Sequence, residues 1–491
     1  MKRISVNTTL LICATITFLS CSKEEKVVVC QLSEAVNRVE TRSDIEAPTI
    51  SDFENNSTKA IIIQDNIPSI IRGFINQRGE DGQIIQTIKT IRKRDLNLAY
   101  AVNFKNGGWV IIAGISPRDK SPILAYSESG YFDPDSINNP GEAFWLEMNL
   151  IRLEQEMIDY QREEPSVPRS TLYDDPYVWV RFILGQDYST TNNYSNVNHL
   201  IETKWGQNDP WNYKCPILNG TLCPLGCTAV AVGQMLYYLN DYNGSPSGLY
   251  HTIIPSYTYH NNNSGSYFTL TVTRTNYYSN SPRWASMATI NPGSVTTSVE
   301  YVGDLLIDIA DRAGSQFTLN STSGETSTAL FSNNYGISCT MSNYSQSTVI
   351  NSLNDSIPVL VTAKISNSPG AKGHEWIIDG YNSSLTTVDH RHKWRMVPPD
   401  SLSYYGSSSY DYVYTESEMQ QFYPNVIENE IIHEYSEFIT YLLRMNWGWH
   451  DNQNIYNDYN DDYDNRLYAM GAWNGGGYDL NYQIKIYHNF Q

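Results

Sequence analysis

The stretch Cys223–Tyr238, CPLGCTAVAVGQMLYY, decides the fold, because a turn runs directly into a helix there. Its apolar residues recur at the three- and four-residue steps of a helix. Gly226 lets the chain turn sharply, and Cys227 falls in the first helical turn, where free N–H groups and the helix dipole favour a thiolate. Cysteine also packs into many protein cores. This helix alone therefore leaves two interpretations open, a nucleophile and a packing residue.

The composition argues against two classes of partner. The chain has 491 residues, enough for two or three domains, and its 33 basic against 52 acidic side chains give a net charge of −19. This charge argues against nucleic acid and against an anionic membrane surface. The 37 tyrosines are typical of β-rich structure. The seven cysteines follow no regular framework, and a Cys215–Cys223 disulfide stays open.

The N-terminal residues predict export. Residues 1–20 combine two basic residues with a short apolar core, which is typical of a signal peptide. Phe18-Leu19-Ser20-Cys21 resembles a lipobox, with Cys21 as the lipid-bearing residue. Residues 21–58 are polar and charged, as in a lipoprotein tether. We therefore expect an extracytoplasmic protein, either an outer-membrane lipoprotein at the cell surface or a secreted protein, with membrane contact only through a lipid on Cys21.

The pattern of residues 59–160 predicts a small α+β domain. Its expected elements are strands over 98–104, 109–113 and 122–126 and a helix over 142–160. The sequence shows no constellation of reactive groups there, which favours binding or inhibition over chemistry. Residues 161–175 are polar and carry two prolines, so they are the expected linker and processing region.

One candidate partner of Cys227 is His374. We expect an apolar strand over residues 359–363 and a second over 376–378, closed by the turn signal Asp379-Gly380. His374 would then lie at the start of a buried strand. An imidazole is the usual general base for a thiol, because its pKa lies close to working pH. A histidine at a strand end is also a common structural residue, so it does not predict catalysis by itself.

Two amide side chains complete the candidate set. A strand over residues 441–445 ends in Asn446-Trp447. The amide can hold the His374 ring in one tautomer, and the indole can shield that hydrogen bond from water. Gln207, upstream of Cys227, can place its N–H₂ group beside the backbone N–H of Cys227 and stabilise an oxyanion. These residue types predict thiol catalysis in combination, and none of them does so alone.

The order of the candidates along the chain is that of the papain-like clan: Gln207, Cys227, His374 and Asn446. Their local sequences resemble the streptopain family of cysteine peptidases. The segments that carry the resemblance are WGQNDPWN at 205–212, GCTAVAVGQ at 226–234, GHEWIIDG at 373–380 and NWGW at 446–449. The strand and turn pattern of residues 59–160 is similar to the inhibitory propeptide of that family. The resemblance covers residues 59–491.

The resemblance implies an α+β fold in which an inhibitory prodomain precedes a papain-like peptidase over residues 176–491, with one helical and one antiparallel β subdomain. It implies a cysteine endopeptidase made as a zymogen, in which Cys227 is the nucleophile, His374 the base, Asn446 its orienter, Trp447 the shield and Gln207 the oxyanion donor. The implied partners are protein or peptide substrates and the prodomain itself, as intramolecular inhibitor. Cleavage between about residues 161 and 200 is expected to release activity. No metal or organic cofactor is implied.

Three departures from the family pattern are visible. Glu375 follows the histidine where the family favours a small residue. His450-Asp451 follows Trp449 where glycines are usual. A long insertion over about residues 380–440 includes His390-Arg391-His392-Lys393, and the sequence does not indicate its role.

Three other interpretations stay open. Cys215, Cys223 and Cys227 offer three thiolates to zinc, but their spacings lack the paired Cys-x-x-Cys of metal sites. Another thiol acyl-transfer enzyme would use the same Cys, His and amide chemistry. A catalytically inactive homologue would act as a surface binding protein, and the assay of a Cys227→Ala variant distinguishes it from an enzyme.

Overall fold

The computed structural model describes residues 60–62, 67–75, 84–117, 121–162, 176–243, 254–261, 266–272, 281–365, 372–405, 410–449, 466–470, 474–475, 478–479 and 484–491. The predicted signal peptide and tether lie outside the described residues, as do residues 163–175 of the predicted linker and His450-Asp451. What the sequence indicates for those segments stays a prediction.

The fold combines compact helices with a few very long strands. The helices are α1 (Ile67–Ile75), α2 (Pro140–Arg162), α4 (Cys227–Asn243), α5 (Ser281–Ser286), α6 (Thr297–Arg312), α7 (Thr328–Tyr335), α8 (Gln346–Asn354) and α9 (Glu416–Phe422), with a 3₁₀ helix at Pro399–Tyr404. The strands of the main sheet are β2 (Ile85–Lys93), β3 (Leu96–Phe104), β4 (Trp109–Ala113), β6 (Ile123–Ser127), β7 (Val178–Val197), β14 (Thr340–Asn343), β15 (Val359–Lys364), β16 (Gly373–Val397), β17 (Tyr410–Tyr414), β18 (Ile431–Asn446), β19 (Leu467–Tyr468) and β22 (Ile484–His488). The remaining strands form pairs: β1 (Ala60–Ile62) with β5 (Ile115–Pro117), β8 (Ile217–Leu218) with β9 (Thr221–Leu222), β10 (Ile254–Asn261) with β11 (Ser266–Val272), β12 (Gln316–Phe317) with β13 (Thr322–Ser323), and β20 (Asn474–Gly475) with β21 (Tyr478–Asp479).

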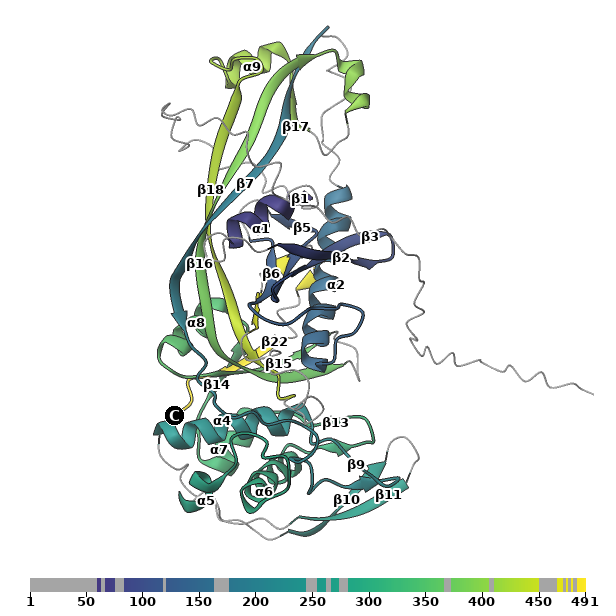
Figure 1. Ribbon diagram of the computed structural model, residues 1–491, viewed down its shortest axis with the longest axis vertical. Coiled ribbons are helices and arrows are strands. Elements are labelled where there is room, and N and C mark those ends of the chain that lie inside the picture. The colour runs from purple at the N-terminus through teal and green to yellow at the C-terminus, as the bar shows by residue number, and fades with distance from the viewer. Residues whose placement is uncertain are drawn as a thin grey trace, which may run out of the picture.

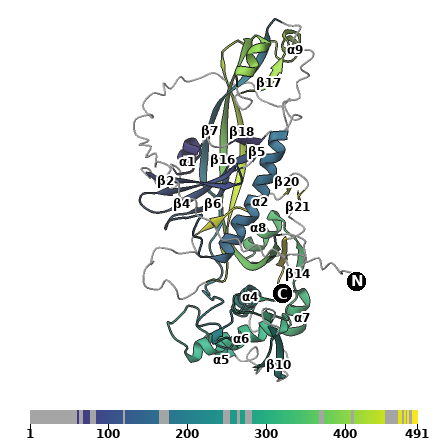
Figure 2. The same ribbon diagram turned by 90° about the vertical axis from the view of Figure 1, so that its right-hand side faces the viewer.

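The N-terminal region, which we define as residues 60–162, contains the three strands and the helix that the sequence predicts, as β3, β4, β6 and α2. Both faces of β3 are buried. Ala99 and Ala101 pack in the core that α2 covers, whereas Tyr100 and Val102 pack in the core that α1 covers. Figure 2 shows the two helices on opposite faces of the strands. Alternating side chains therefore place β3 between two helices.

The main sheet has twelve strands and joins the N-terminal region to the rest of the chain. Its path runs β14-β22-β15-β16-β18-β19-β6-β4-β3-β2, while β7 pairs with β16 and β17 pairs with β7. The junction lies between β6 and β19, where Tyr126 pairs with Leu467 and Ala125 with Tyr468 in antiparallel register. The N-terminal strands are thus continuous with those that carry His374 and Asn446.

The helical region, which we define as the described parts of residues 227–335, packs against one end of this sheet (Figure 1). Ala229, Val230 and Val232 of α4 have no exposed surface, which is typical of a helix inside a core. Gly233 lies where α6 packs on α4, and a side chain there would displace the end of the Leu306 side chain. The core of this region includes Ile377 of β16, so the start of β16 lies against α4.

Three long strands, β7, β16 and β18, extend the sheet into an arm, which also includes β17 and α9 (Figure 1). The prediction that Asp379-Gly380 ends a strand is wrong, because β16 continues from Gly373 to Val397. A bulge lies between Ile378 and Gly380. A Cβ at Gly380 would lie 2.7 Å from Val197 O, so this glycine allows the close approach of β7. The long insertion noted in the sequence forms most of the arm.

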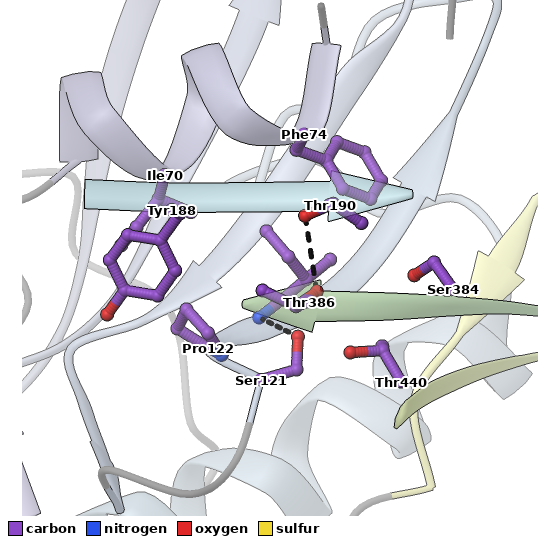
Figure 3. A pocket seen from close by; sticks show the side chains of 10 residues that line it. Ile70, Phe74, Ser121, Pro122, Tyr188, Thr190, Ser384, Thr386 and Thr440 are labelled. Atoms are coloured by element: carbon purple, nitrogen blue, oxygen red, sulfur yellow. Dashed lines mark hydrogen bonds between the residues drawn. The ribbon is translucent and has the colours of Figure 1, made fainter. Parts of the chain in front are cut away.

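Helix α1 of the N-terminal region packs on the arm. Gly73 lies so close to the backbone of Tyr188 in β7 that no side chain fits there. Figure 3 shows the small pocket beside this contact, where Thr190 Oγ1 and Thr386 Oγ1 lie 3.2 Å apart. The N-terminal region is therefore held both by the β6–β19 junction and by the arm.

The α+β class predicted from the sequence is confirmed. The helical region supplies Cys227, and the sheet supplies His374 and Asn446. In the part of the chain that the structure describes, no helix has the length and apolar character needed to cross a membrane.

Candidate active site

Cys227 is the first residue of α4 and lies where the helical region meets the sheet. Gly226 turns the chain into the helix with a φ of 90°, and a Cβ there would lie 2.9 Å from Thr322 O. Cys227 is partly exposed as a residue, and its sulfur accepts hydrogen bonds from the backbone N–H groups of Thr228 and Glu375. Burial and the Glu375 carboxylate raise the pKa of Cys227 to about 12, against the effect of those N–H groups. In the uncut chain the Cys227 thiol therefore keeps its proton at neutral pH.

Gln207 lies beside the turn that leads to Cys227. Its backbone carbonyl accepts a hydrogen bond of 2.8 Å from Leu225 N–H, and its side chain is buried. Trp205 and Trp211, with ring centroids 6.2 Å apart, fix the loop in the core of the helical region. The backbone of Gln207 is therefore held close to the turn before Cys227.

His374 is the second residue of β16, and its ring is buried on the side of the strand that faces α2. Its Nε2 donates to Trp447 O at 3.2 Å, so Nδ1 is the unprotonated nitrogen of the neutral ring. Burial lowers the pKa of His374 to about 4, although the bond to Trp447 O opposes this. His374 is thus a neutral imidazole at pH 7.

Trp447 packs against the His374 ring. The two ring centroids are 6.0 Å apart, and the indole also contacts Trp376 at 5.2 Å and Tyr468 at 5.4 Å. Trp447 is 2% exposed, so this aromatic cluster keeps water away from one side of the imidazole. The same exclusion of water lowers the pKa of His374.

Asn446, the last residue of β18, pairs with Gln234 of α4, which sequence reasoning missed. Gln234 Nε2 donates to Asn446 Oδ1 at 3.1 Å, and Asn446 Nδ2 donates to Gln234 Oε1 at 3.2 Å. Thr203 Oγ1 donates to Gln234 Oε1 at 3.1 Å, and Gly448 N–H donates to Asn446 Oδ1 at 3.1 Å. A glutamine among the apolar residues of α4 is the sequence signal that could have found this pair, because buried amides need partners.

Replacing Gln234 by leucine is expected to lower the free energy of unfolding by about 1–3 kcal/mol, because Asn446 and Thr203 lose a buried partner. Equilibrium unfolding in urea measures the change. Gln420→Leu is the control, since Gln420 is exposed on α9 and its bond to Glu416 is a surface pair worth about 0.2–0.5 kcal/mol. Equal effects of the two substitutions would show that the amide pair does not stabilise the site.

The N-terminal end of α2 lies against His374. Asn139 caps this helix, because its Oδ1 accepts from Gly141 N–H at 2.9 Å and from Glu142 N–H at 3.2 Å. A Cβ on Gly141 would lie 2.9 Å from His374 Nε2 and 2.8 Å from Trp447 Cβ. Only a glycine allows the backbone of α2 to come this close to both rings.

A buried ion pair holds the same end of α2 to the sheet. Arg466 Nη1 donates to both carboxylate oxygens of Glu142 at 2.8 Å, and Tyr468 Oη donates to Glu142 Oε1 at 2.8 Å. The charged side chains are only 3% and 4% exposed. Sequence reasoning missed this contact, because its partners lie 324 positions apart and show no local pattern.

The three other cysteines that the structure describes are free thiols. Cys215 and Cys223 are buried free thiols and are not joined in a disulfide, and Cys339 is a partly exposed thiol. Across the described ranges, no group of three or more His, Cys, Asp or Glu side chains is arranged to hold a metal ion.

Two protein families match separate parts of the chain. The Peptidase C10 family matches residues 205–394, which contain Gln207, Cys227 and His374. The Spi protease inhibitor family matches residues 60–150.

Two solved structures are similar to the chain. A prointerpain A fragment from Prevotella intermedia is 17% identical with a TM-score of 0.46, over 82% of this chain and 98% of that one. The active wild-type interpain A cysteine protease of Prevotella intermedia is 18% identical with a TM-score of 0.34, over 60% of this chain and 94% of that one. No curated protein matches the chain.

The resemblance noted in the sequence is thereby confirmed for both parts of the chain, the inhibitor region and the peptidase region. Residues 205–394 thus form a cysteine peptidase region that matches the Peptidase C10 family, the streptopain family, and a Spi-type inhibitor region precedes it at residues 60–150.

Proposed function

We propose that this cysteine peptidase zymogen is a latent endopeptidase, which hydrolyses peptide bonds of protein or peptide substrates through Cys227, His374 and Asn446. The observation that carries the proposal is the close approach of Gly141 to His374 and Trp447, which leaves no room for a side chain between them. The inhibitor region thereby occupies the side of β16 on which the His374 ring lies. Cys227 lies against the backbone of the next residue, Glu375.

Catalysis requires the His374 ring to turn toward Cys227 after α2 has moved away. His374 Nδ1 then takes the proton of Cys227 Sγ, and the thiolate attacks the carbonyl carbon of the substrate. The backbone N–H of Cys227 and the amide of Gln207 stabilise the oxyanion. The imidazolium returns its proton to the leaving amine as the C–N bond breaks. Water then gives a proton to His374 and attacks the thioester. The C–S bond breaks, the carboxylic acid product leaves, and His374 returns the proton to Cys227 Sγ.

Asn446 is the proposed acceptor for His374 Nε2–H in the active state. In the latent state Nε2–H donates to the carbonyl of Trp447, the residue next to Asn446. On activation this hydrogen bond moves from the backbone carbonyl of Trp447 to the side-chain oxygen of Asn446. The amide then fixes the orientation of the His374 ring. Gln234 holds Asn446 in place meanwhile, so that the orienting group is fixed before activation.

Activation is expected from a cut between Arg162 and Val178. Residues 178–197 form β7, which pairs with β16 and in part with β17, so a cut there would break a paired strand. The wild-type chain should shorten in that interval on incubation, as read by mass spectrometry. The Cys227→Ser chain should stay intact. A variant chain that shortens at the wild-type rate would contradict self-processing.

The buried neutral His374 predicts a pH dependence of the stability of the uncut chain. The pKa is about 4 in the folded chain against an ordinary value of 6.5, so the unfolded chain takes up this proton first as the pH falls. His374 alone should therefore lower the free energy of unfolding by about 3 kcal/mol as the pH falls from 6.5 to 4, whereas the buried Glu375, whose pKa is raised to about 7, changes it in the opposite direction over an overlapping range.

Urea unfolding over this pH range measures the dependence. The stability of the wild type relative to His374→Gln should fall by about 3 kcal/mol over this range, whereas its stability relative to His199→Gln, a change at an exposed position, should stay constant. If the wild type and His374→Gln show the same slope, the imidazole is not held neutral by burial.

A further inference from the structure

Glu375 is buried beside the nucleophile and faces the helical region. It follows His374 in β16, and neighbouring side chains of a strand point to opposite faces. Its side chain is 6% exposed. Thr326 donates to the carboxylate from its N–H at 3.3 Å and from its hydroxyl, and the Thr228 side chain forms a further hydrogen bond. The carboxyl group therefore links the strand of His374 to two segments of the helical region.

Glu375 acts on the thiol in two opposite ways. Its backbone N–H hydrogen-bonds to Cys227 and lowers the pKa of the thiol, whereas its carboxylate charge raises that pKa. A negative charge close to Sγ opposes the formation of a second one. The charge state of Glu375 therefore affects how readily Cys227 loses its proton.

The surroundings of Glu375 bring its ionisation close to neutral pH. Burial raises the pKa of Glu375 to about 7 and the charge of Glu325 adds to the rise, while the bonds from Thr326 and Thr228 oppose it. The titratable groups that face Glu375 are Cys227 of α4, Glu325 of the loop before α7 and Tyr487 of β22. Thr326 and Thr228 contribute neutral hydroxyl groups.

We propose that Glu375 is a positioning residue for the nucleophile: its carboxyl group ties the strand of His374 to the first turn of the Cys227 helix, and its ionisation makes the thiolate harder to form. This inference rests on Cys227 being the nucleophile of the proposed function. The tie survives protonation of Glu375, because a threonine hydroxyl can accept as well as donate. Protonation therefore removes the charge from the site and keeps the geometry.

Alkylation of Cys227 by iodoacetamide tests the proposal on the full chain and needs no peptidase activity. Rate constants are measured over a series of pH values by mass spectrometry of the peptide that contains Cys227. Glu375→Gln keeps the size and hydrogen-bonding capacity of the side chain and removes its charge. Above pH 7 we expect the variant to react about three- to tenfold faster, because removal of the nearby negative charge lowers the pKa of the Cys227 thiol, while a more acidic thiol is slightly less nucleophilic.

Glu325→Gln is the matched control, since it removes a carboxylate from the same neighbourhood at an exposed position and should change the rates little. Thr326→Val serves if Glu375→Gln does not fold. It keeps the carboxyl group and removes a hydroxyl donor, so Glu375 holds its proton to higher pH and alkylation near pH 7 should rise. A purely structural role would change the melting temperature without changing the shape of the pH profile.

Rates of a folded Glu375→Gln or Thr326→Val variant that coincide with the wild type at every pH overturn the proposal. A shifted alkylation profile in a processed chain that cleaves no peptide supports the role of Glu375 and contradicts the proposed function instead. The two failures can therefore be told apart.

Discussion

Replacing Cys227 by serine is expected to lower kcat/KM of the processed chain by a factor of about 10⁴ or more, because catalysis by a nucleophile and its base is lost as a unit. A serine hydroxyl at the start of α4 has a far higher pKa than a thiol, so much less of the anionic nucleophile forms at the same pH. Hydrolysis of a labelled denatured protein by wild-type and variant chains measures the loss. Both chains are first cut between residues 162 and 178 by an added protease.

The control for this prediction is Cys339→Ser. Cys339 is a partly exposed free thiol like Cys227, and its pKa is raised to about 11 by burial, but it has no place in the proposed chemistry. Its replacement should leave activity unchanged, and an epoxide thiol trap should label Cys227 alone in the active chain. Equal activity of wild type and Cys227→Ser, or a wild type without activity after processing, would favour the interpretation as an inactive binding protein.

Replacing Glu142 by alanine is expected to lower the free energy of unfolding of the uncut chain by about 3–5 kcal/mol, because Arg466 is left buried without its carboxylate. The same substitution should loosen the end of α2 that touches His374, since Gly141 lies next to Glu142. We therefore also expect the uncut chain to process itself faster. Urea unfolding of the Cys227→Ser background measures the first effect, and the time course of shortening in the Cys227 chain measures the second.

Asp133→Asn is the matched control for Glu142→Ala. Asp133 pairs with Lys89 at 2.7 Å within the same N-terminal region, but both side chains are about one-third exposed, at 35% and 33%. Such a surface pair contributes about 1 kcal/mol or less. If the two substitutions lower stability equally, or if Glu142→Ala leaves the rate of shortening unchanged, the buried pair does not hold the inhibitor region on the site.

Local patterns in the sequence determined much of the organisation of this protein. Alternation located β3, a turn signal and short apolar runs located β4 and β6, and helical periodicity located α2 and α4, because a helix or a strand imposes its period on the side chains. Short motifs also located Cys227 at a helix start and His374 at a strand start, which depends only on neighbours in the chain. The family matches confirm the enzyme class that these motifs indicated.

Only the tertiary structure decided which side chains meet. Gln234 pairs with Asn446 across 212 positions, and Glu142 pairs with Arg466 across 324. Asp379-Gly380 has the composition of a turn, yet strands on both sides hold it in a bulged strand. The orientation of the His374 ring depends on α2, which reaches it through the packing of the whole sheet. Local sequence could therefore predict the chemical groups of the site, but not the packing of α2 against His374 and Trp447, since contacts between distant segments set that arrangement.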